Sequence, residues 1–369
     1  MTRGPVGVAV VGCGNISNAY LSNLTSFPDL NVVFCADLDI ERAKAQAAQY
    51  GVPQAGTMEQ AIAAPEVELV VNLTIPAAHV PVATTAIAAG KHVWIEKPLA
   101  LDTASGRELL AAADAAGVLV GCAPDTVLGA GLQTVRRLID AGTIGTPQAA
   151  LALLQDPGPD QWHPDPEFLF QRGAGPLYDM GPYYLTALAT LFGPAESVAA
   201  LGRRSRDRRV IGAGPRAGTS FDVEVPTHIA ALINYAGGQA ASLVMSFDSP
   251  LRRGGFVEIT GTEATLATPD PNGFDGDVRV QTADADDWAI TPSTGASVAG
   301  RGLGVLDLAR AIRHGGRPRA SGEMALHVLE IMEAITASAD TGAFVPVRTT
   351  FTTPDALTEG WDPLARTLT

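Results

Sequence analysis

The sequence predicts an α/β fold with a doubly wound parallel sheet, followed by an α+β domain with a large, open, mainly antiparallel sheet. An apolar run over residues 6–11 leads directly into two glycines, which is how such a parallel sheet often begins. Strand and helix patterns then alternate up to residue 122. Strand-like segments dominate from residue 197 to 280. We therefore expect one domain over residues 1–124 and a second over 125–369.

The two glycines after the first strand indicate a dinucleotide-binding turn. Gly12 permits the tight turn, and Gly14 lets a pyrophosphate approach the backbone. The amides of Asn15 and Ile16 would then open a helix and point at that phosphate. Ser17 occupies the third small position, where Gly or Ala is preferred. An ordinary tight turn is the alternative interpretation of this motif.

The second strand, expected over residues 31–36, supports the dinucleotide interpretation because Asp37 stands at its end. A carboxylate there accepts hydrogen bonds from the ribose hydroxyls of an adenosine. Asp37 could instead cap the helix expected over residues 40–50, but Asp39 lies nearer to that helix. Arg42, the nearest cation, is one turn into the helix. We therefore expect NAD as the cofactor rather than NADP.

Further elements complete the first domain. Residues 67–73 form a near-continuous apolar run, as expected for a central parallel strand. The remaining elements are expected to be a helix over 76–89 that ends at Gly90, a strand over 92–95, a helix over 102–116 and a strand over 118–122.

In the second domain the helical and strand patterns no longer alternate regularly. Its expected elements are helices over 128–141 and 178–191, a strand over 148–154, a hairpin of 227–235 with 239–247, and helices over 303–313 and 324–339. The strand-rich stretch has no further helices to cover a second face. We therefore expect another subunit to cover it, in a homodimer or homotetramer.

Two groups of residues could carry chemistry. Glu96, Lys97 and Pro98 follow a parallel strand at its carboxyl end, where ligands of such sheets lie. The Lys97 cation could hydrogen-bond the reacting oxygen of an alcohol or carbonyl and stabilise a developing alkoxide. A solvated lysine after a strand is the alternative.

The second group is Asp179 and Tyr183, which share one face of the expected helix because they are four residues apart. A carboxylate and a phenol on one face can hold a substrate hydroxyl, and Tyr183 can exchange a proton with it. The alternative is an acidic residue near a helix N-terminus with a core aromatic one turn later.

Composition excludes several other classes of protein. The chain has 25 basic and 39 acidic residues, a formal net charge of −14, which argues against nucleic acid or an anionic membrane as a partner. The one basic cluster, Arg203 to Arg209, is expected to be a solvated loop. No run of 18 apolar residues or signal peptide is recognised. Three cysteines in apolar contexts, without metal-ligand spacing, indicate buried reduced thiols, a cytoplasmic protein and no metal site.

These motifs together resemble the glucose–fructose oxidoreductase / inositol dehydrogenase / rhizopine-catabolism (Gfo/Idh/MocA) family of NAD(P)-dependent oxidoreductases. The resemblance covers nearly the whole chain. It rests on residues 8–17, on Thr74-Ile75-Pro76 with His79, on 90–99, on 175–183 and on 325–330.

The resemblance implies roles for individual residues. It places Lys97 at the reacting oxygen with Asp179 beside it, and Thr74 and His79 along the nicotinamide half of the cofactor. Inositol dehydrogenases have a histidine where this chain has Tyr183, whereas sugar-oxidising and keto-sugar-reducing members have tyrosine, so an inositol substrate is in doubt.

The same resemblance extends to the Pro-rich loop before the Asp179 helix. Trp162 and His163 are similar to a segment that reaches over cofactor and substrate in relatives, although Trp162 could equally pack under its loop. His163 and Arg172 are candidate substrate contacts.

The implied function is NAD-dependent hydride transfer between nicotinamide and a carbinol or keto carbon of a sugar, sugar derivative or cyclitol. The alternatives are an NAD-assisted lyase or glycosidase with transient oxidation and a non-catalytic nucleotide-sensing regulator.

Overall fold

The computed structural model describes residues 4–296, 298 and 300–369, and the chain folds as two compact units. The first unit contains the chain up to Gln133 together with Thr294–Leu329 and Pro354–Thr369. The second contains Thr134–Ser293 and Glu330–Thr353. In this division the chain crosses to the second unit after Gln133, and residues near its end lie in the first unit.

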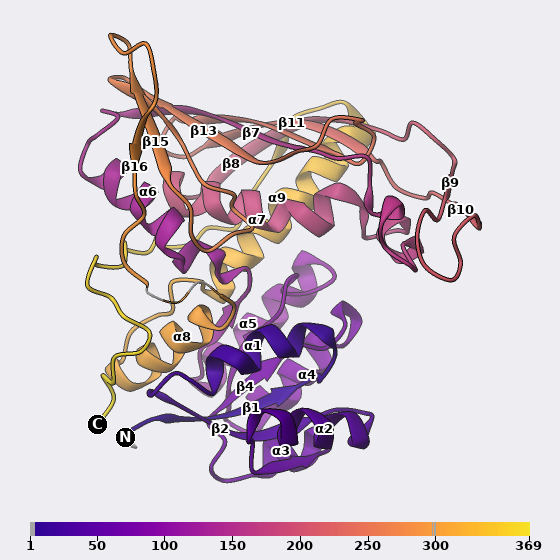
Figure 1. Ribbon diagram of the computed structural model, residues 1–369, viewed down its shortest axis with the longest axis vertical. Coiled ribbons are helices and arrows are strands. Elements are labelled where there is room, and N and C mark those ends of the chain that lie inside the picture. Colours follow the sequence, from indigo (N-terminus) through magenta and orange to yellow (C-terminus); the bar gives the residue numbers. More distant parts are fainter. Residues whose placement is uncertain (1–3, 297, 299) are drawn as a thin grey trace. The chain divides into compact units, whose positions relative to one another are not determined.

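The first unit is built on a six-stranded parallel sheet in the order β3-β2-β1-β4-β5-β6. Its helices surround these strands (Figure 1). The strands are β1 (Val6–Val11), β2 (Leu30–Ala36), β3 (Gln54–Gly56), β4 (Leu69–Asn72), β5 (His92–Ile95) and β6 (Val120–Cys122). The helices are α1 (Asn15–Leu24), α2 (Ile40–Tyr50), α3 (Met58–Ala63), α4 (Pro76–Ala88), α5 (Thr103–Ala116) and α8 (Leu303–His314), with a 3-10 turn over Asp125–Leu128.

The parallel register brings the carboxyl ends of the central strands to one edge. Val11 pairs with Ala36 on one side and with Asn72 on the other, and Asn72 pairs with Ile95. The residues that directly follow these strands, such as Gly12, Asp37 and Glu96, therefore lie near one another at this edge. β1 is buried along its whole length, as expected for a central strand covered on both faces.

The end of the chain is held to the first unit by a buried carboxylate. Asp29 is fully buried and accepts hydrogen bonds from Arg310 Nε (2.9 Å), from the amide and hydroxyl of Thr367 (2.8 and 2.7 Å) and from the Leu368 amide (2.9 Å). Burial opposes ionisation of Asp29, but these four donors together hold its pKa below the ordinary value. Asp29 therefore joins α8 and the last residues of the chain to the first unit.

The second unit is built on a nine-stranded sheet in the order β16-β15-β14-β13-β7-β12-β11-β8-β17. Only β7 and β12 pair in parallel; the other neighbours are antiparallel, which confirms the expected open and mainly antiparallel sheet. The strands are β7 (Pro147–Gln155), β8 (Ala195–Arg203), β11 (His228–Tyr235), β12 (Ala240–Ser246), β13 (Arg253–Gly261), β14 (Ala264–Ala267), β15 (Val278–Thr282), β16 (Ala289–Thr291) and β17 (Val345–Pro346).

One face of this sheet is covered by helices. They are α6 (Ala130–Asp140), α7 (Gly175–Phe192) and α9 (Gly322–Thr341), and they lie on the same side of the strands (Figure 1). The other face exposes Leu151 of β7, Leu201 of β8 and Leu232 of β11. Successive side chains of a strand point to opposite faces of a sheet, so the neighbouring residues Ala152, Ala200 and Ile233 are buried on the helix-covered face.

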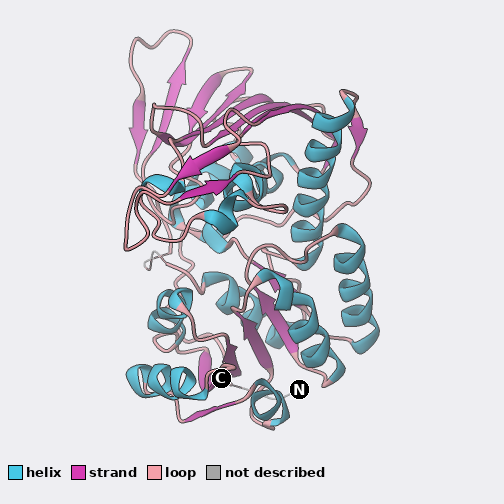
Figure 2. Ribbon diagram, turned by 90° about the vertical axis from the view of Figure 1, so that its right-hand side faces the viewer, coloured by secondary structure: helices cyan, strands magenta, loops and turns pink. Residues whose placement is uncertain are grey.

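Two short strands stand apart from the large sheet. β9 (Arg208–Val210) and β10 (Ser220–Asp222) form their own two-stranded antiparallel sheet (Figure 2). The expectation that Arg203 to Arg209 form a solvated loop is wrong for Arg209, which is buried among carboxylates, whereas residues 203–208 are exposed as expected. Among the described residues, no helix is long and apolar enough to cross a membrane.

Candidate active site

The turn after β1 has the shape of a phosphate-binding turn. Gly12 has a φ of +96°, and a Cβ there would lie 2.7 Å from the carbonyl carbon and oxygen of Leu73 and 2.8 Å from the Thr74 amide nitrogen. A Cβ at Gly14 would meet nothing within 4 Å, so the outer side of the turn is open. No side chain caps the amino end of α1, which leaves the amides of Asn15 and Ile16 directed at an anion in that space.

Asp37 directly follows β2, next to the glycine turn at the carboxyl edge of the parallel sheet. Its Oδ2 accepts a hydrogen bond from the Cys13 amide (2.7 Å) and its Oδ1 one from the Asp39 amide (2.9 Å). The carboxylate thus orients the glycine turn, and the lone pairs that remain can accept ribose hydroxyls. Asp39 caps α2 through the amides of Glu41 and Arg42, as expected. The residues present therefore fit a dinucleotide.

Arg42 lies closer to this site than the sequence indicated. Its Nη1 is 3.6 Å from Asp37 Oδ1, and its Nη2 is 3.4 Å from Asp39 Oδ2. About half of the Arg42 side chain is exposed, so the guanidinium stands at the rim of the ribose position. Asp39 is three residues before Arg42, a spacing that allows this contact, but the direction of the Arg42 side chain is not visible in the sequence.

Thr74 and His79 are joined by a buried network that sequence reasoning missed. Asn72 Oδ1 accepts the Thr74 amide (3.3 Å) and hydroxyl (2.6 Å), and Asn72 Nδ2 donates to the His79 carbonyl (3.0 Å). The His79 ring lies between two carbonyl oxygens, with Nδ1 2.7 Å from that of Pro98 and Nε2 3.0 Å from that of Thr74. Burial holds the pKa of His79 below its ordinary value, although hydrogen bonds to those two carbonyls act in the opposite direction.

His79 is fully buried behind this edge of the sheet. Its ring ties the Thr74 backbone to Pro98, the residue after Lys97. Asn72 could have been noticed as a polar residue at the end of an apolar strand, which is costly to bury unless it is hydrogen-bonded.

Glu96 holds the backbone of Lys97 from within the unit. Its Oε2 accepts the Lys97 amide (2.9 Å), and its Oε1 accepts the hydroxyl of Tyr20 (2.8 Å) on α1. Tyr20 in turn accepts a hydrogen bond from Trp94 Nε1 (3.3 Å). Burial, followed by the Glu96 charge, raises the pKa of Tyr20 well above its ordinary value, so the phenol stays protonated and donating. Glu96 therefore links the helix of the glycine turn to the Lys97 position.

In the second unit, Asp179 and Tyr183 lie on α7 as expected. This helix begins at Gly175 rather than at residue 178, because Pro176 is well suited to the first turn of a helix. The two residues are four apart within continuous helix, so they share one face. Tyr183 is 5% exposed and Asp179 is half-buried.

The loop before α7 presents an exposed aromatic cluster, formed by Trp162, His163 and Phe168. Trp162 is 61% exposed, which overturns the alternative that it packs under its loop. The His163 ring makes edge contacts with both neighbours, each at 5.5 Å between centroids. Arg172 is exposed a few residues further along.

The candidate residues thus form two groups. The first unit brings together Gly12, Gly14, Asn15, Ile16, Asp37, Thr74, Glu96 and Lys97 at one sheet edge, with His79 behind them. The second unit carries Asp179, Tyr183, Trp162, His163 and Arg172. A dinucleotide turn on a doubly wound sheet, followed by an open α+β sheet, defines a class of two-domain nicotinamide-dependent oxidoreductases.

Comparison with known proteins specifies this class further. Residues 6–123 match the oxidoreductase family with an NAD-binding Rossmann fold, and residues 132–267 match the GFO/IDH/MocA C-terminal domain. The two regions together cover more than half of the chain. The chain belongs to the Gfo/Idh/MocA family of oxidoreductases.

Curated relatives are enzymes of oxidation and reduction. Trans-1,2-dihydrobenzene-1,2-diol dehydrogenase of Mus musculus is 28% identical over 68% of this chain and 71% of its own. 1,5-Anhydro-D-fructose reductase of Ensifer adhaerens is 26% identical over 92% of this chain and 98% of its own. These relatives are a dehydrogenase and a reductase, in keeping with the oxidoreductase family to which this chain belongs.

Solved structures have the same fold. An NAD binding oxidoreductase from Klebsiella pneumoniae superimposes with a TM-score of 0.81 at 25% identity and covers 94% of this chain and 100% of its own. Levoglucosan dehydrogenase, in complex with NADH and L-sorbose, superimposes with a TM-score of 0.79 at 23% identity over the same shares. The predicted fold class is thus confirmed.

Substituting each of the two glycines of the turn should affect different properties, cofactor binding for Gly14 and folding stability for Gly12. Gly14→Ala should fold with nearly native thermal stability, because φ is −74° and the space is open, yet weaken cofactor binding at least about tenfold by filling the phosphate position. Gly12→Ala should lower the free energy of unfolding by more than about 1 kcal/mol, since φ is positive and a Cβ meets backbone. Thermal melts and fluorescence titration with NADH measure both; native NADH affinity in Gly14→Ala would contradict the phosphate assignment.

Proposed function

We propose that this protein transfers hydride between NAD and a carbinol or keto carbon of a sugar, sugar derivative or cyclitol. The observation that carries the proposal is the Lys97 backbone, held by Glu96 at the same sheet edge as the glycine turn and Asp37. The names of the relatives support the substrate class, because levoglucosan, 1,5-anhydrofructose and dihydrobenzenediol are all small rings that carry hydroxyl or keto groups.

In this proposal three side chains manage the substrate oxygen. In oxidation, one of two bases, the neutral Lys97 amine or the Tyr183 phenolate, accepts the single hydroxyl proton as the hydride leaves to NAD, and in reduction the same group returns it. In its protonated form, Lys97 stabilises negative charge that develops on the oxygen. Asp179 orients a substrate hydroxyl and favours the protonated form of Lys97. When bound, the nicotinamide supplies or accepts the hydride. Thr74, Trp162, His163 and Arg172 are proposed to line the cofactor and substrate.

The direct experiment is a turnover screen. The protein is incubated with NAD and levoglucosan, trans-1,2-dihydrobenzene-1,2-diol or myo-inositol, and with NADH and 1,5-anhydro-D-fructose, while the NADH absorbance is followed. Net change in NADH with a sugar-like ring supports the proposal. Product formation without net change in NADH would instead support the lyase alternative, which the dehydrogenases and reductase named above do not favour.

Substitutions of the three proposed groups should separate their roles. Lys97→Met should retain cofactor binding and lower turnover by at least about 10²-fold, the low end for a general acid or base. Tyr183→Phe should also be slower, because only the hydroxyl is removed. Asp179→Asn should be slower and displace the pH–rate profile, because the shape remains while the charge is lost.

Steady-state kinetics across pH measures all three variants. A native rate in Tyr183→Phe would make Tyr183 a core aromatic, in keeping with its 5% exposure. An unchanged rate and pH profile in Asp179→Asn would assign Asp179 to the helix terminus alone.

We further propose that NAD is preferred over NADP. Asp37 supports this preference, because a carboxylate accepts ribose hydroxyls and repels a 2′-phosphate. Arg42 opposes it only weakly, because its guanidinium already neighbours Asp37 and Asp39. Asp37→Ala should weaken NAD binding by about 1.5–3 kcal/mol and NADP binding by less. Fluorescence titration with both cofactors tests this, and equal or tighter NADP binding by the native protein would refute it.

We propose a homodimer or homotetramer joined through the open face of the nine-stranded sheet. The exposed Leu151, Leu201 and Leu232 support this, because apolar side chains on a broad sheet face favour burial against another surface. Leu232→Glu should shift light scattering at micromolar concentration towards the mass of a single chain. Native protein that already scatters as a single chain would contradict the assembly.

We also propose a cytoplasmic location. Cys13, Cys35 and Cys122 are all free and buried, as in proteins of reducing compartments.

A further inference from the structure

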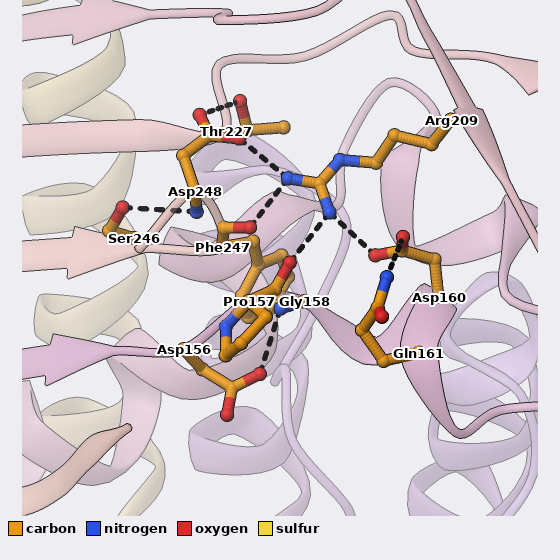
Figure 3. A network of polar contacts seen from close by, with 10 residues as sticks. All are labelled: Asp156, Pro157, Gly158, Asp160, Gln161, Arg209, Thr227, Ser246, Phe247 and Asp248. Carbon is orange, nitrogen blue, oxygen red and sulfur yellow. Dashed lines mark hydrogen bonds and ion pairs between the residues drawn. The ribbon is translucent and has the colours of Figure 1, made fainter. Parts of the chain in front are cut away.

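Arg209 lies at the centre of a buried network in the second unit (Figure 3). Its Nη1 donates to Asp160 Oδ1 (2.6 Å) and to the Pro157 carbonyl (2.8 Å). Its Nη2 donates to Asp248 Oδ1 (2.5 Å) and to the Phe247 carbonyl (2.5 Å). The guanidinium thus joins the loop after β7 to the segment that follows β12.

The charges of this network are almost completely removed from solvent. The side chains of Arg209 and Asp160 are 2% and 3% exposed. Burial opposes ionisation of Asp248, but hydrogen bonds from Thr227, Ser205 and Arg209 together hold its pKa below the ordinary value, so it remains a carboxylate. One cation therefore faces two carboxylates, and either would be costly to bury without Arg209.

The geometry of the loop depends on this guanidinium. Gly158 has a φ of +112°, and a Cβ there would lie 2.5 Å from both Arg209 Nη1 and Asp160 Oδ1. From the other side, the Gly212 amide donates to the Asp160 carbonyl (2.7 Å). The loop is therefore held between Arg209 and the segment after β9, two residues before Trp162.

Trp162 and His163 emerge directly from this anchored segment. His163 Nδ1 accepts a hydrogen bond from the Asp165 amide (3.0 Å), so the hydrogen of a neutral ring resides on Nε2, which is then a donor. Beside it, Trp162 presents an exposed indole. An aromatic face next to a ring N–H donor suits the C–H-rich face of a ring that carries hydroxyl groups.

We propose that Arg209 is a positioning residue for substrate. It fixes the 156–161 segment so that Trp162 packs on the apolar face of a cyclic polyol and His163 donates to one of its hydroxyls. The inference rests on the proposed function and deepens it, because it specifies a ring-shaped substrate rather than an open-chain one. Holding the loop in advance removes an ordering cost that substrate binding would otherwise meet.

The test is a double-mutant cycle between Arg209→Met and Trp162→Ala, with levoglucosan and NAD as the probe, or whichever compound of the screen is turned over. Arg209→Met alone should lower kcat/KM by about 10²-fold, mainly through KM. In the Trp162→Ala background the same change should have a smaller effect, limited to the loss of the His163 hydrogen bond, because Arg209 acts through these two side chains. Additive losses, or an unchanged KM, would overturn the inference.

Arg208→Met is the matched control. Arg208 is the neighbouring residue, but its ion pair with Asp222 is exposed, so this variant should retain native kinetics. A loss equal to that of Arg209→Met would show a general effect on the β9–β10 strands and would overturn the inference. Asp160→Asn weakens the same network with little change in shape and replaces Arg209→Met if that variant fails to fold.

A readout without turnover keeps the proposed function and this inference distinguishable. The fluorescence of Trp162 is obtained by subtracting the spectrum of Trp162→Phe from that of the native protein. The anisotropy of this Trp162 fluorescence should fall in Arg209→Met or Asp160→Asn, because the loop is then less firmly held. It should not fall in Arg208→Met. If no ring compound changes NADH, the proposed function fails, while unchanged anisotropy refutes positioning by Arg209. Equal turnover of open-chain and ring polyols would refute the ring specificity.

Discussion

The close approach of Gly12 to the backbone of Leu73 and Thr74 is the constraint on which the cofactor edge depends. A Cβ at Gly12 would lie only 2.7–2.8 Å from backbone atoms of Leu73 and Thr74, so a side chain has no room there. The turn after β1 therefore packs directly against the end of β4. The next residue donates its amide to Asp37 and thereby joins the end of β2 to the same turn. Three strand ends are fixed by one glycine and one carboxylate, and the amide end of α1 takes its direction from them.

Behind this edge, buried polar groups position the residues that face outward. Glu96 uses both carboxylate oxygens, one on Tyr20 and one on the Lys97 amide. His79 spans the carbonyls of Thr74 and Pro98. Polar groups at such depth are costly unless each is satisfied, so they restrict the backbone around Lys97 to one arrangement. Precise placement of a charged side chain is what proton transfer requires.

The second unit uses a different means to present its side chains. The helix α7 fixes the spacing of Asp179 and Tyr183 through its own backbone geometry. The aromatic loop has no regular structure beyond short 3-10 turns, and a buried ion network anchors it at its base. An exposed Trp162 is thereby combined with an anchored backbone.

The sequence by itself determined the periodic and local features. The strand at residues 92–95 and the helix at 40–50 were predicted with the observed bounds, and the Asp39 cap and the two-glycine turn follow from chemistry within a few residues. The family resemblance and its motifs were recognisable for the same reason. Hydrophobic periodicity and short-range capping act over one or two turns of chain, so they are legible in the sequence.

Only the tertiary structure decided which polar residues are buried and with whom. Residues 294–329 and 354–369 belong to the first unit, where Asp29 accepts hydrogen bonds from donors more than 280 residues away in the sequence. Arg209 looked like part of a solvated basic run and is instead the buried partner of two carboxylates. His79 is likewise buried, with its ring between the carbonyls of Thr74 and Pro98. Burial of a charge is set by contacts between distant segments, and neither composition nor spacing encodes those contacts in a form that can be read residue by residue.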